Sequence, residues 1–323
     1  MATFLRHYGS LIGMAAIVLF FWIALPDTFM TLRNWLNISQ QLSMLVVVAV
    51  TMTVVMVMGD FDLSVGAMAS LSGVVAAVLF TYDLPVAVAL AAALTVGLLG
   101  GLANGVLVSL VGILPFVATL ATLTMFSGAA FLVSGGKTIF GRDIPQGFAD
   151  FARFGLPIGS WDGKPVLLPA LTLLAAAVTF LVWVVLEHTT YGRRLYAIGG
   201  NAEAARLAGV NVAYLRLSAF AFTGVGAALA GIMYASRVAS ANPVQGDGLM
   251  LTAIAAVFLG MTVTRDGQPN VLATVAGVVT LGVMDNGLTQ LQVDSYVRQV
   301  LVGAIILVAV SISALGRRAL RRH

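Results

Sequence analysis

About ten long apolar stretches divide this chain, and most polar residues lie in the segments between them. A helix needs roughly 20 apolar residues to cross the hydrocarbon core of a bilayer. Charged residues make up only 9% of the 323 residues, against about 25% in soluble domains. A soluble core of this size has no use for so much apolar surface. The sequence therefore predicts an all-α, polytopic membrane protein whose residues 1–323 form a single transmembrane domain.

The expected spans begin with a helix that is retained in the mature protein. The first stretch is long enough to cross the membrane and is followed by Pro26 and Asp27 instead of a small-residue cleavage site, so we interpret it as a signal anchor. The ten spans cover approximately residues 8–26, 40–58, 65–82, 85–110, 114–134, 166–186, 217–236, 249–263, 271–289 and 297–315.

The positions of the arginines predict the orientation, because cytoplasmic segments carry an excess of Lys and Arg. Two regions are rich in arginine: the polar segment 187–216 and the C-terminal tail. They contain Arg193, Arg194, Arg206, Arg216, Arg317, Arg318, Arg321 and Arg322. Four spans separate the two regions and six precede the first, so both regions and both termini are expected in the cytoplasm. Arg6 and Arg265 fall on the same side.

The same parity places residues 135–165 on the outer side. This segment is rich in Gly and Pro with interspersed aromatic residues, and its basic residues are accompanied by Asp143, Asp150 and Asp162. We expect a structured outer loop with a short interfacial helix at 146–153. Two roles fit it equally: a connecting loop that lies on the membrane surface, or a landing site for a partner outside the cell.

The polar segment 187–216 contains a compact helix signal. Asn201 can cap the free backbone N–H groups, and Glu203 lies in the first turn, where a negative charge favours the helix dipole. Arg206 lies in the last turn, and Gly209 can adopt the left-handed conformation that ends a helix. About seven helical residues, roughly 10 Å, are too few to be stable alone. The helix must pack on its own membrane domain or on another protein.

Two carboxylates, Asp60 and Asp62, lie between the second and third spans. One interpretation is a cytoplasmic turn in which Asp62 caps the next helix near Ser64. The other is a broken helix that reaches into the bilayer, with Gly66 permitting the break and polar groups facing a pathway. Charges inside a membrane cost about 2.5–3.5 kcal/mol on insertion scales, so they are usually functional or paired. The sequence leaves both interpretations open.

A faint internal repeat connects the fourth and ninth spans. The segment Gly101–Gly105 and the segment Gly282–Gly287 each end in Asn-Gly, with Asn104 and Asn286 separated by 182 residues. The two copies are five spans apart, so they would run in opposite directions, as in the inverted repeats of transport proteins. Asn104, Asn286 and the neighbouring Asp285 are polar residues within apolar spans. Hydrogen bonds between helices and contacts with a transport pathway are both possible roles.

Several kinds of site are not expected in this chain. There is no cysteine, and none of the three histidines lies within a span or in a His-Glu-x-x-His motif. A catalytic cluster and a metal site are therefore not predicted. The sequence has no Gly-x-x-x-x-Gly-Lys-Ser/Thr loop, so we expect no bound cofactor and no ATP binding by this chain. The net charge of +4 reflects basic loops and tails that fix topology, and no nucleic-acid partner is implied.

Three motifs resemble the permeases of bacterial ATP-binding-cassette (ABC) importers for monosaccharides of the ribose, arabinose and xylose type. Residues 192–210, with Gly199, Gly200, Asn201, Glu203, Arg206, Leu207 and Gly209, resemble the loop that couples such permeases to their ATPase. Gly59–Gly66, in its Gly-Asp-Phe-Asp form, resembles the family signature and is most similar to arabinose-type members. The third match is Ala228–Gly231 with Ser240–Gly248 downstream. The turn at 261–267 departs from the glycine-richer form of many relatives.

The resemblance implies a multi-pass permease of the bacterial inner membrane with three protein partners. These are a second permease copy, which makes a homodimer the expected assembly, a cytoplasmic ATPase subunit that holds ATP and Mg²⁺, and a periplasmic sugar-binding protein. The seven loop residues named above would couple the permease to the ATPase. The candidate signature and pathway residues are Asp60, Asp62, Ser64, Gly66, Asn104, Asp285 and Asn286.

Two other classes of function remain open from the sequence. An importer for a different small polar solute, such as a branched-chain amino acid or a signalling sugar, would have the same fold. A secondary transporter would need no ATPase, although it would be expected to carry acidic or basic residues within several spans, and these are sparse here. A membrane-embedded enzyme would need a catalytic cluster that the sequence does not contain.

Overall fold

The computed structural model describes residues 2–161, 164–264, 267–301, 303, 304 and 307. The side chains of residues 1–11 are outside that description. Thirteen helices lie within the described residues: α1 (Ala2–Ala24), α2 (Leu32–Met56), α3 (Val65–Thr81), α4 (Val86–Ser109), α5 (Pro115–Ser134), the 3₁₀ helix η1 (Gly141–Asp143), α6 (Gln146–Arg153), α7 (Ala170–His188), α8 (Thr190–Gly200), α9 (Ala202–Leu207), α10 (Val212–Val238), α11 (Asp247–Met261) and α12 (Val271–Gln290). The strands are β1 (Ile139–Phe140), β2 (Gly155–Trp161), β3 (Lys164–Pro169) and β4 (Ser240–Ala241).

The helices confirm a polytopic membrane protein. Six of them are long and apolar enough to cross a membrane: α2, α4, α5, α7, α10 and α12. Three shorter apolar helices, residues 12–24 of α1 together with α3 and α11, coincide with further expected spans. The tenth expected span, residues 297–315, lies largely outside the described residues, as do Arg265 and the arginines of the C-terminal tail.

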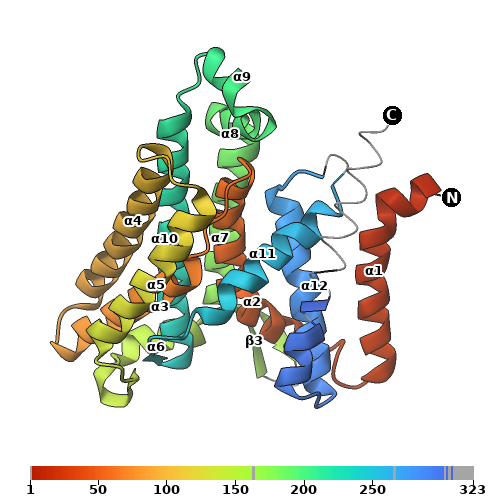
Figure 1. Cartoon of the computed structure of the whole chain (residues 1–323). Coiled ribbons are helices and arrows are strands. Elements are labelled where there is room, and N and C mark those ends of the chain that lie inside the picture. The colour runs from red at the N-terminus through yellow and green to blue at the C-terminus, as the bar shows by residue number, and fades with distance from the viewer. Residues whose placement is uncertain (1, 162–163, 265–266, 302, 305–306, 308–323) are drawn as a thin grey trace.

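Helix α10 forms the centre of the bundle and packs against α2, α3 and α4 (Figure 1). Its contact with α4 depends on small residues, because Gly97, Gly101 and Gly105 lie on successive turns of α4 and face α10. A Cβ at Gly101 would overlap the carbonyl oxygen of Phe220. Small residues of this kind allow membrane helices to approach closely. By contrast, α4 and α5 expose most of their apolar side chains, as expected of helices that face lipid.

Two of the bundle's helices are interrupted by non-helical segments of equal length. Residues 57–64, which we call the first break, connect α2 to α3, and residues 239–246, the second break, connect α10 to α11. The offset is 182 residues both from Met56 to Val238 and from Val65 to Asp247. This equals the spacing of Asn104 and Asn286, so the weak sequence repeat and the helix boundaries agree.

The two breaks enter the bundle from opposite ends. The first break begins beside α8, because a Cβ at Gly199 would overlap the carbonyl oxygen of Val57. The second break begins at the other end, where β4 pairs with β1 through Ile139↔Ala241 and Phe140↔Ser240. In Figure 1, α8 and α9 project from the top of the bundle, whereas α6 and the β2–β3 hairpin lie at the bottom.

The described part of the segment 135–165, which leaves out residues 162 and 163, is structured and contains the expected helix. Helix α6 has the bounds predicted from the sequence, Gln146–Arg153. It is fixed to the bundle by two hydrogen bonds: Gln40 Nε2 donates to the carbonyl oxygen of Ala152, and Ser236 Oγ donates to that of Phe148. The antiparallel β2–β3 hairpin that follows was not predicted from the sequence.

Candidate functional site

Helix α8 carries the first part of the arginine-rich segment and rests on the end of α2. Thr189 caps it, since its side chain accepts a hydrogen bond from the backbone N–H of Gly192. At the other end of α8, Gly199 lies against the backbone at Val57, where a side chain would not fit. Gly199 and Gly200 therefore belong to the last turn of α8. They lie immediately before Asn201, which caps the following helix.

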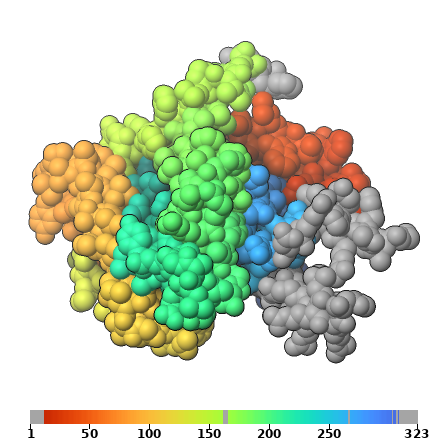
Figure 2. Space-filling model, turned by 90° about the horizontal axis from the view of Figure 1, so that it is seen from above, coloured from red at the N-terminus to blue at the C-terminus, as the bar shows by residue number. Residues whose placement is uncertain are grey.

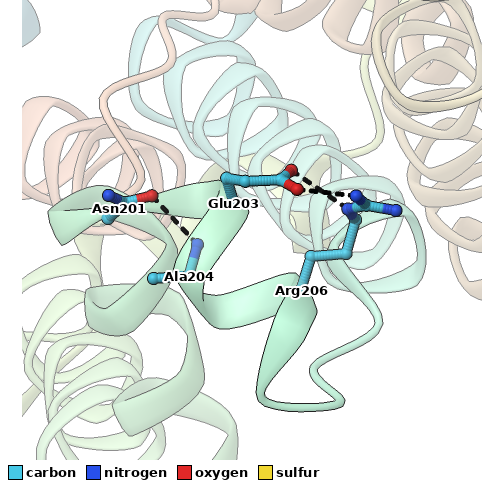
Figure 3. Close-up of polar contacts among 4 residues, drawn as sticks. All are labelled: Asn201, Glu203, Ala204 and Arg206. Carbon is cyan, nitrogen blue, oxygen red and sulfur yellow. Dashed lines mark hydrogen bonds and ion pairs between the residues drawn. The ribbon is translucent and has the colours of Figure 1, made fainter.

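Helix α9 has the caps that the sequence predicts. The Asn201 side chain accepts a hydrogen bond of 3.0 Å from the backbone N–H of Ala204 (Figure 3). After the helix, Gly209 adopts a φ of +85°, which is the left-handed conformation that favours glycine. The helix has six residues, one fewer than expected, and is too short to be stable without packing.

The exposed face of α9 combines an ion pair with an apolar side chain. Arg206 donates to both carboxylate oxygens of Glu203, at 2.6 and 3.0 Å (Figure 3). This hydrogen-bonded arginine lowers the pKa of the Glu203 carboxyl, so the residue stays charged at neutral pH. Leu207 beside the pair is 78% exposed, whereas Ala205 on the opposite face is buried. Figure 2 looks onto this end of the molecule and shows α8 and α9 uncovered across the middle of the face.

A half-buried tyrosine, Tyr196, connects the α8–α9 segment to α7 and to the start of α12. The Tyr196 hydroxyl lies 2.9 Å from a carboxylate oxygen of Glu187 in α7 and 3.1 Å from the carbonyl oxygen of Pro269, just before α12. Burial and the Glu187 carboxylate both raise the pKa of Tyr196, which therefore remains a donor. A cleft of about 400 Å³ lies next to this junction and is lined by Trp183, Glu187, His188, Asn270 and Leu272.

Asp60 lies in the first break and pairs with Arg216 in α10. Arg216 Nε lies 2.8 Å from Asp60 Oδ2, and Arg216 Nη2 donates a hydrogen bond of 3.2 Å to Oδ1. The Nε–H does not point at Oδ2, so the ion pair contains one hydrogen bond. The Asp60 side chain is only 6% exposed. Sequence reasoning assigned Arg216 to the polar loop and missed this pairing.

Asp62 belongs to a second, fully buried polar cluster. Its Oδ1 accepts hydrogen bonds from the Ser64 backbone N–H at 2.9 Å and from Ser64 Oγ at 2.6 Å. Asn104 Nδ2 donates to Ser64 Oγ at 2.8 Å, and Asn104 Oδ1 accepts from Thr122 Oγ1 at 2.7 Å. The cluster therefore joins the first break to α4 and α5. Asn104 forms hydrogen bonds between helices, which is one of the two roles that the sequence suggested for it.

The depth of this cluster distinguishes a surface turn from a buried one. Asn104 lies five residues before the end of α4, and Thr122 lies seven residues after the start of α5. At 1.5 Å per residue these positions are roughly 8–11 Å inside the helix ends. As whole residues, Asp60, Asp62 and Ser64 are buried. Apart from Gly59, which is exposed, the residues of the first break are thus buried or half-buried in the bundle instead of forming an exposed turn.

Gly66 lies at the point where the two breaks meet. A Cβ at Gly66 would be 2.6 Å from the carbonyl oxygen of Gly246, and one at Gly246 would overlap that of Gly66. The backbone N–H of Gly246 donates a hydrogen bond of 2.8 Å to Ser70 Oγ in α3. Helices α3 and α11 therefore start side by side and run toward opposite ends of the bundle.

Asp285 and Asn286 lie apart from the other candidate residues, near the end of α12. Asn286 Oδ1 accepts hydrogen bonds from Asn34 in α2 at 3.1 Å and from Gln290 at 2.8 Å. Asp285 is half exposed and pairs with Arg298 at 2.9 Å. The two residues are therefore close to the end of the bundle opposite α9, and the structure does not bring them to the breaks. No group of three or more His, Asp or Glu side chains that could hold a metal is found within the described ranges.

Together these features define a multi-pass membrane permease, a helical bundle with two breaks and an exposed α8–α9 segment. Its sequence matches the profile of the family described as "Branched-chain amino acid transport system / permease component" over residues 34–310, and the chain belongs to this family. It is a non-catalytic permease component of a bacterial ABC importer.

Curated relatives match almost the whole chain. The ribose import permease protein RbsC of Escherichia coli (strain K12) is 35% identical over 312 residues, which cover 95% of this chain and 94% of the relative. RbsC of Bacillus subtilis (strain 168) is 36% identical over 306 residues, 95% and 92% of the two chains. The L-arabinose transport system permease protein AraH of Escherichia coli (strain K12) is 34% identical over 304 residues, 94% and 89%. No solved structure matches the chain.

Proposed function

We propose that this permease moves a monosaccharide, of pentose size, inward across the inner membrane. The observation that carries the proposal is near full-length similarity to permeases named for ribose and L-arabinose. Their identities to this chain differ by only a few per cent, so they do not decide between the two sugars. The arabinose-like form of the Gly59–Gly66 motif favours arabinose.

The proposed assembly consists of two copies of this chain, a cytoplasmic ATPase subunit that hydrolyses Mg-ATP, and a periplasmic sugar-binding protein. The contact with the ATPase is assigned to α9. Its ion pair and the exposed Leu207 offer a charged and an apolar contact side by side, as protein interfaces commonly do. A six-residue helix with one buried face gains stability when a partner covers its other face. The adjacent Gly199, Gly200, Asn201 and Gly209 shape the loop that presents it.

The proposed topology has ten spans in two inverted repeats, with both termini and residues 187–216 in the cytoplasm and residues 135–165 outside. The common offset of 182 residues and the opposite entry of the two breaks support the repeat. The arrangement of α8–α9 and α6 at opposite ends of the bundle supports the loop assignment (Figure 1).

Transport is proposed to follow closure of the ATPase on ATP, which displaces α9 and changes the packing of the spans that follow it. The pathway then opens to the other side, as in any two-state alternation driven by a partner that binds the states unequally. Asp60, Asp62 and Ser64 lie in the break nearest to the coupling loop, and Gly66 and Asn104 lie beside it. We assign all five to the region of the bundle that rearranges around the pathway. Asp285 and Asn286 are assigned to its outer end.

The function is tested by reconstituting the permease in liposomes with its ATPase and binding protein. Uptake of labelled ribose or arabinose should require ATP on the side of the membrane that carries the ATPase. It should be insensitive to collapse of ion gradients. Uptake that follows an ion gradient without ATP would instead identify a secondary transporter. The family description favours one further candidate, import of a branched-chain amino acid. Labelled leucine in the same assay distinguishes that candidate.

A charge swap in α9 tests the coupling contact. In the double variant E203R/R206E the two side chains can still pair with each other, so the helix is retained, and only the small interaction of each charge with the helix dipole is reversed. The positions of the negative and the positive charge on the exposed face of α9, which a partner would contact, are exchanged. We expect the variant to reach the membrane at the wild-type level, to lose copurification of the ATPase and to lose sugar uptake.

The matched control is D150N, which removes the exposed Asp150–Arg153 ion pair at the opposite end of the bundle. It should leave ATPase copurification unchanged. Normal uptake by the α9 double variant would contradict the docking assignment.

The topology is tested by labelling single cysteines, because the natural chain contains none. D143C and R193C place a cysteine at exposed positions of the proposed outer and cytoplasmic loops. A membrane-impermeant maleimide should label D143C in intact spheroplasts and R193C only after permeabilisation. The reverse pattern would overturn the orientation.

A further inference from the structure

The first break is attached to the bundle at two separate places. On one side, Asp62 and Ser64 bond to Asn104 of α4, which bonds in turn to Thr122 of α5. On the other side, Asp60 pairs with Arg216 of α10. Because α4 and α5 are long spans, the first attachment fixes the break to the lipid-facing part of the bundle. The second connects it to the helix that begins at the coupling loop.

The path from α9 to Arg216 is short, because only residues 208–211 connect α9 to α10. The backbone N–H of Val210 bonds to the carbonyl oxygen of Ala205, which folds the chain back onto α9. Asn211 then caps α10 by accepting the N–H of Tyr214 at 3.0 Å. Arg216 lies in the second turn of α10. A displacement of α9 therefore moves the start of α10. Because α10 is a rigid element, the Arg216 guanidinium moves with it.

The ion pair distinguishes the two breaks. The second break is held by uncharged contacts, namely the β1–β4 pairing, the Gly246–Ser70 hydrogen bond and the bond from Gln245 to the carbonyl oxygen of Gly231. None of the ion pairs among the described residues involves it. A charged connection is thus found at the break that faces the coupling loop, and only uncharged ones at the break that faces outward.

We propose that the Asp60–Arg216 pair is a positioning pair that transmits the displacement of α9 to the first break and thereby to α3. The inference rests on the proposed coupling of α9 to an ATPase. Neither side chain contacts the sugar or ATP in this mechanism. The pair stays joined while α10 moves, so the break follows α10, and the Asp62–Asn104 cluster acts as the pivot. A buried charge pair suits this task because it resists separation in both directions, whereas apolar surfaces slide past each other.

The test uses the complete transporter with D60N, R216K and the charge-exchanged double variant D60R/R216D. For D60N we expect the ATPase to copurify and to hydrolyse ATP, while the number of sugars imported per ATP falls by roughly tenfold, a factor within the range typical of coupling between sites. R216K keeps the positive charge but loses the planar guanidinium group. Its number of sugars imported per ATP should lie between those of wild type and D60N. The double variant should import more sugar per ATP than either D60R or R216D alone.

The control is D83N, which also removes one carboxylate but lies exposed between α3 and α4. Asp83 has a φ of +56°, which asparagine tolerates. Its sugar-to-ATP ratio should equal that of wild type. A wild-type ratio in D60N would overturn the inference, as would loss of ATPase copurification, which would make the pair part of the docking surface. Failure of wild type itself to couple ATP hydrolysis to uptake would instead refute the proposed function. If D60N does not fold, R216K and the double variant give the same decision.

Discussion

Gly66→Val should abolish sugar uptake and lower the amount of folded permease. The position has no room for a side chain, since its Cβ would lie 2.6 Å from the carbonyl oxygen of Gly246. A valine would force apart the starts of α3 and α11. Overpacking of this kind typically costs about 1–3 kcal/mol, and at this point it also separates the two repeats. The measurements are uptake per molecule and the fraction of monodisperse protein after extraction.

Gly248→Ala is the matched control for that variant. Gly248 lies in the first turn of α11, only two residues beyond Gly246, but a Cβ there meets nothing within 4 Å. The Gly248→Ala variant should retain wild-type sugar uptake and the wild-type fraction of monodisperse protein. If Gly66→Val transported sugar as well as Gly248→Ala does, the close contact between the two breaks would not matter for function.

Asn104→Leu is the second substitution with a large expected effect, and its effect is on stability. Leucine fills a similar volume but offers no donor for Ser64 Oγ and no acceptor for Thr122 Oγ1. Loss of a buried hydrogen-bond partner costs about 1–3 kcal/mol for each group left unsatisfied. We expect the midpoint of thermal unfolding in detergent to fall by roughly 2–10 °C.

Thr95→Val provides the comparison. The Thr95 hydroxyl is exposed on α4 and bonds only within its own helix, to the carbonyl oxygen of Ala91. The unfolding midpoint should stay close to that of wild type. An unchanged midpoint in Asn104→Leu would show that the Asp62 cluster contributes little to stability, and the role of this cluster as a pivot would then lose its support.

Local signals explain what the sequence could predict. The caps of α9 are formed by residues that lie within the helix or next to it, so Asn201 and Gly209 could be read directly from a single sequence. The same holds for α6 and for the apolar spans, whose length is fixed by the membrane. The 182-residue spacing was also visible in the sequence, although only as Asn-Gly at two positions, because the remaining agreement lies in helix boundaries and not in shared residues.

Long-range contacts explain what could not be predicted. Whether Gly59–Ser64 forms a surface turn or a buried break depends on the helices that surround it, and hydropathy does not report that depth. The pairing of Asp60 with Arg216 joins residues 156 positions apart. Nothing in either local sequence identifies the other. Asp285 and Asn286 illustrate the same limit, since the span count placed them within an apolar span and the structure shows them near the end of the bundle opposite α9.

The separation of Asp60 and Arg216 also has a consequence for biosynthesis. Asp60 enters the membrane with the first spans, whereas its partner is still to be translated. At typical rates of 5–20 residues per second, the intervening 156 residues take on the order of 10–30 s. The Asp62 cluster can close earlier, once α5 has been made. The first helices are therefore synthesised while the Asp60 carboxylate is still unpaired. The ion pair forms only after α10, which carries Arg216, has been made.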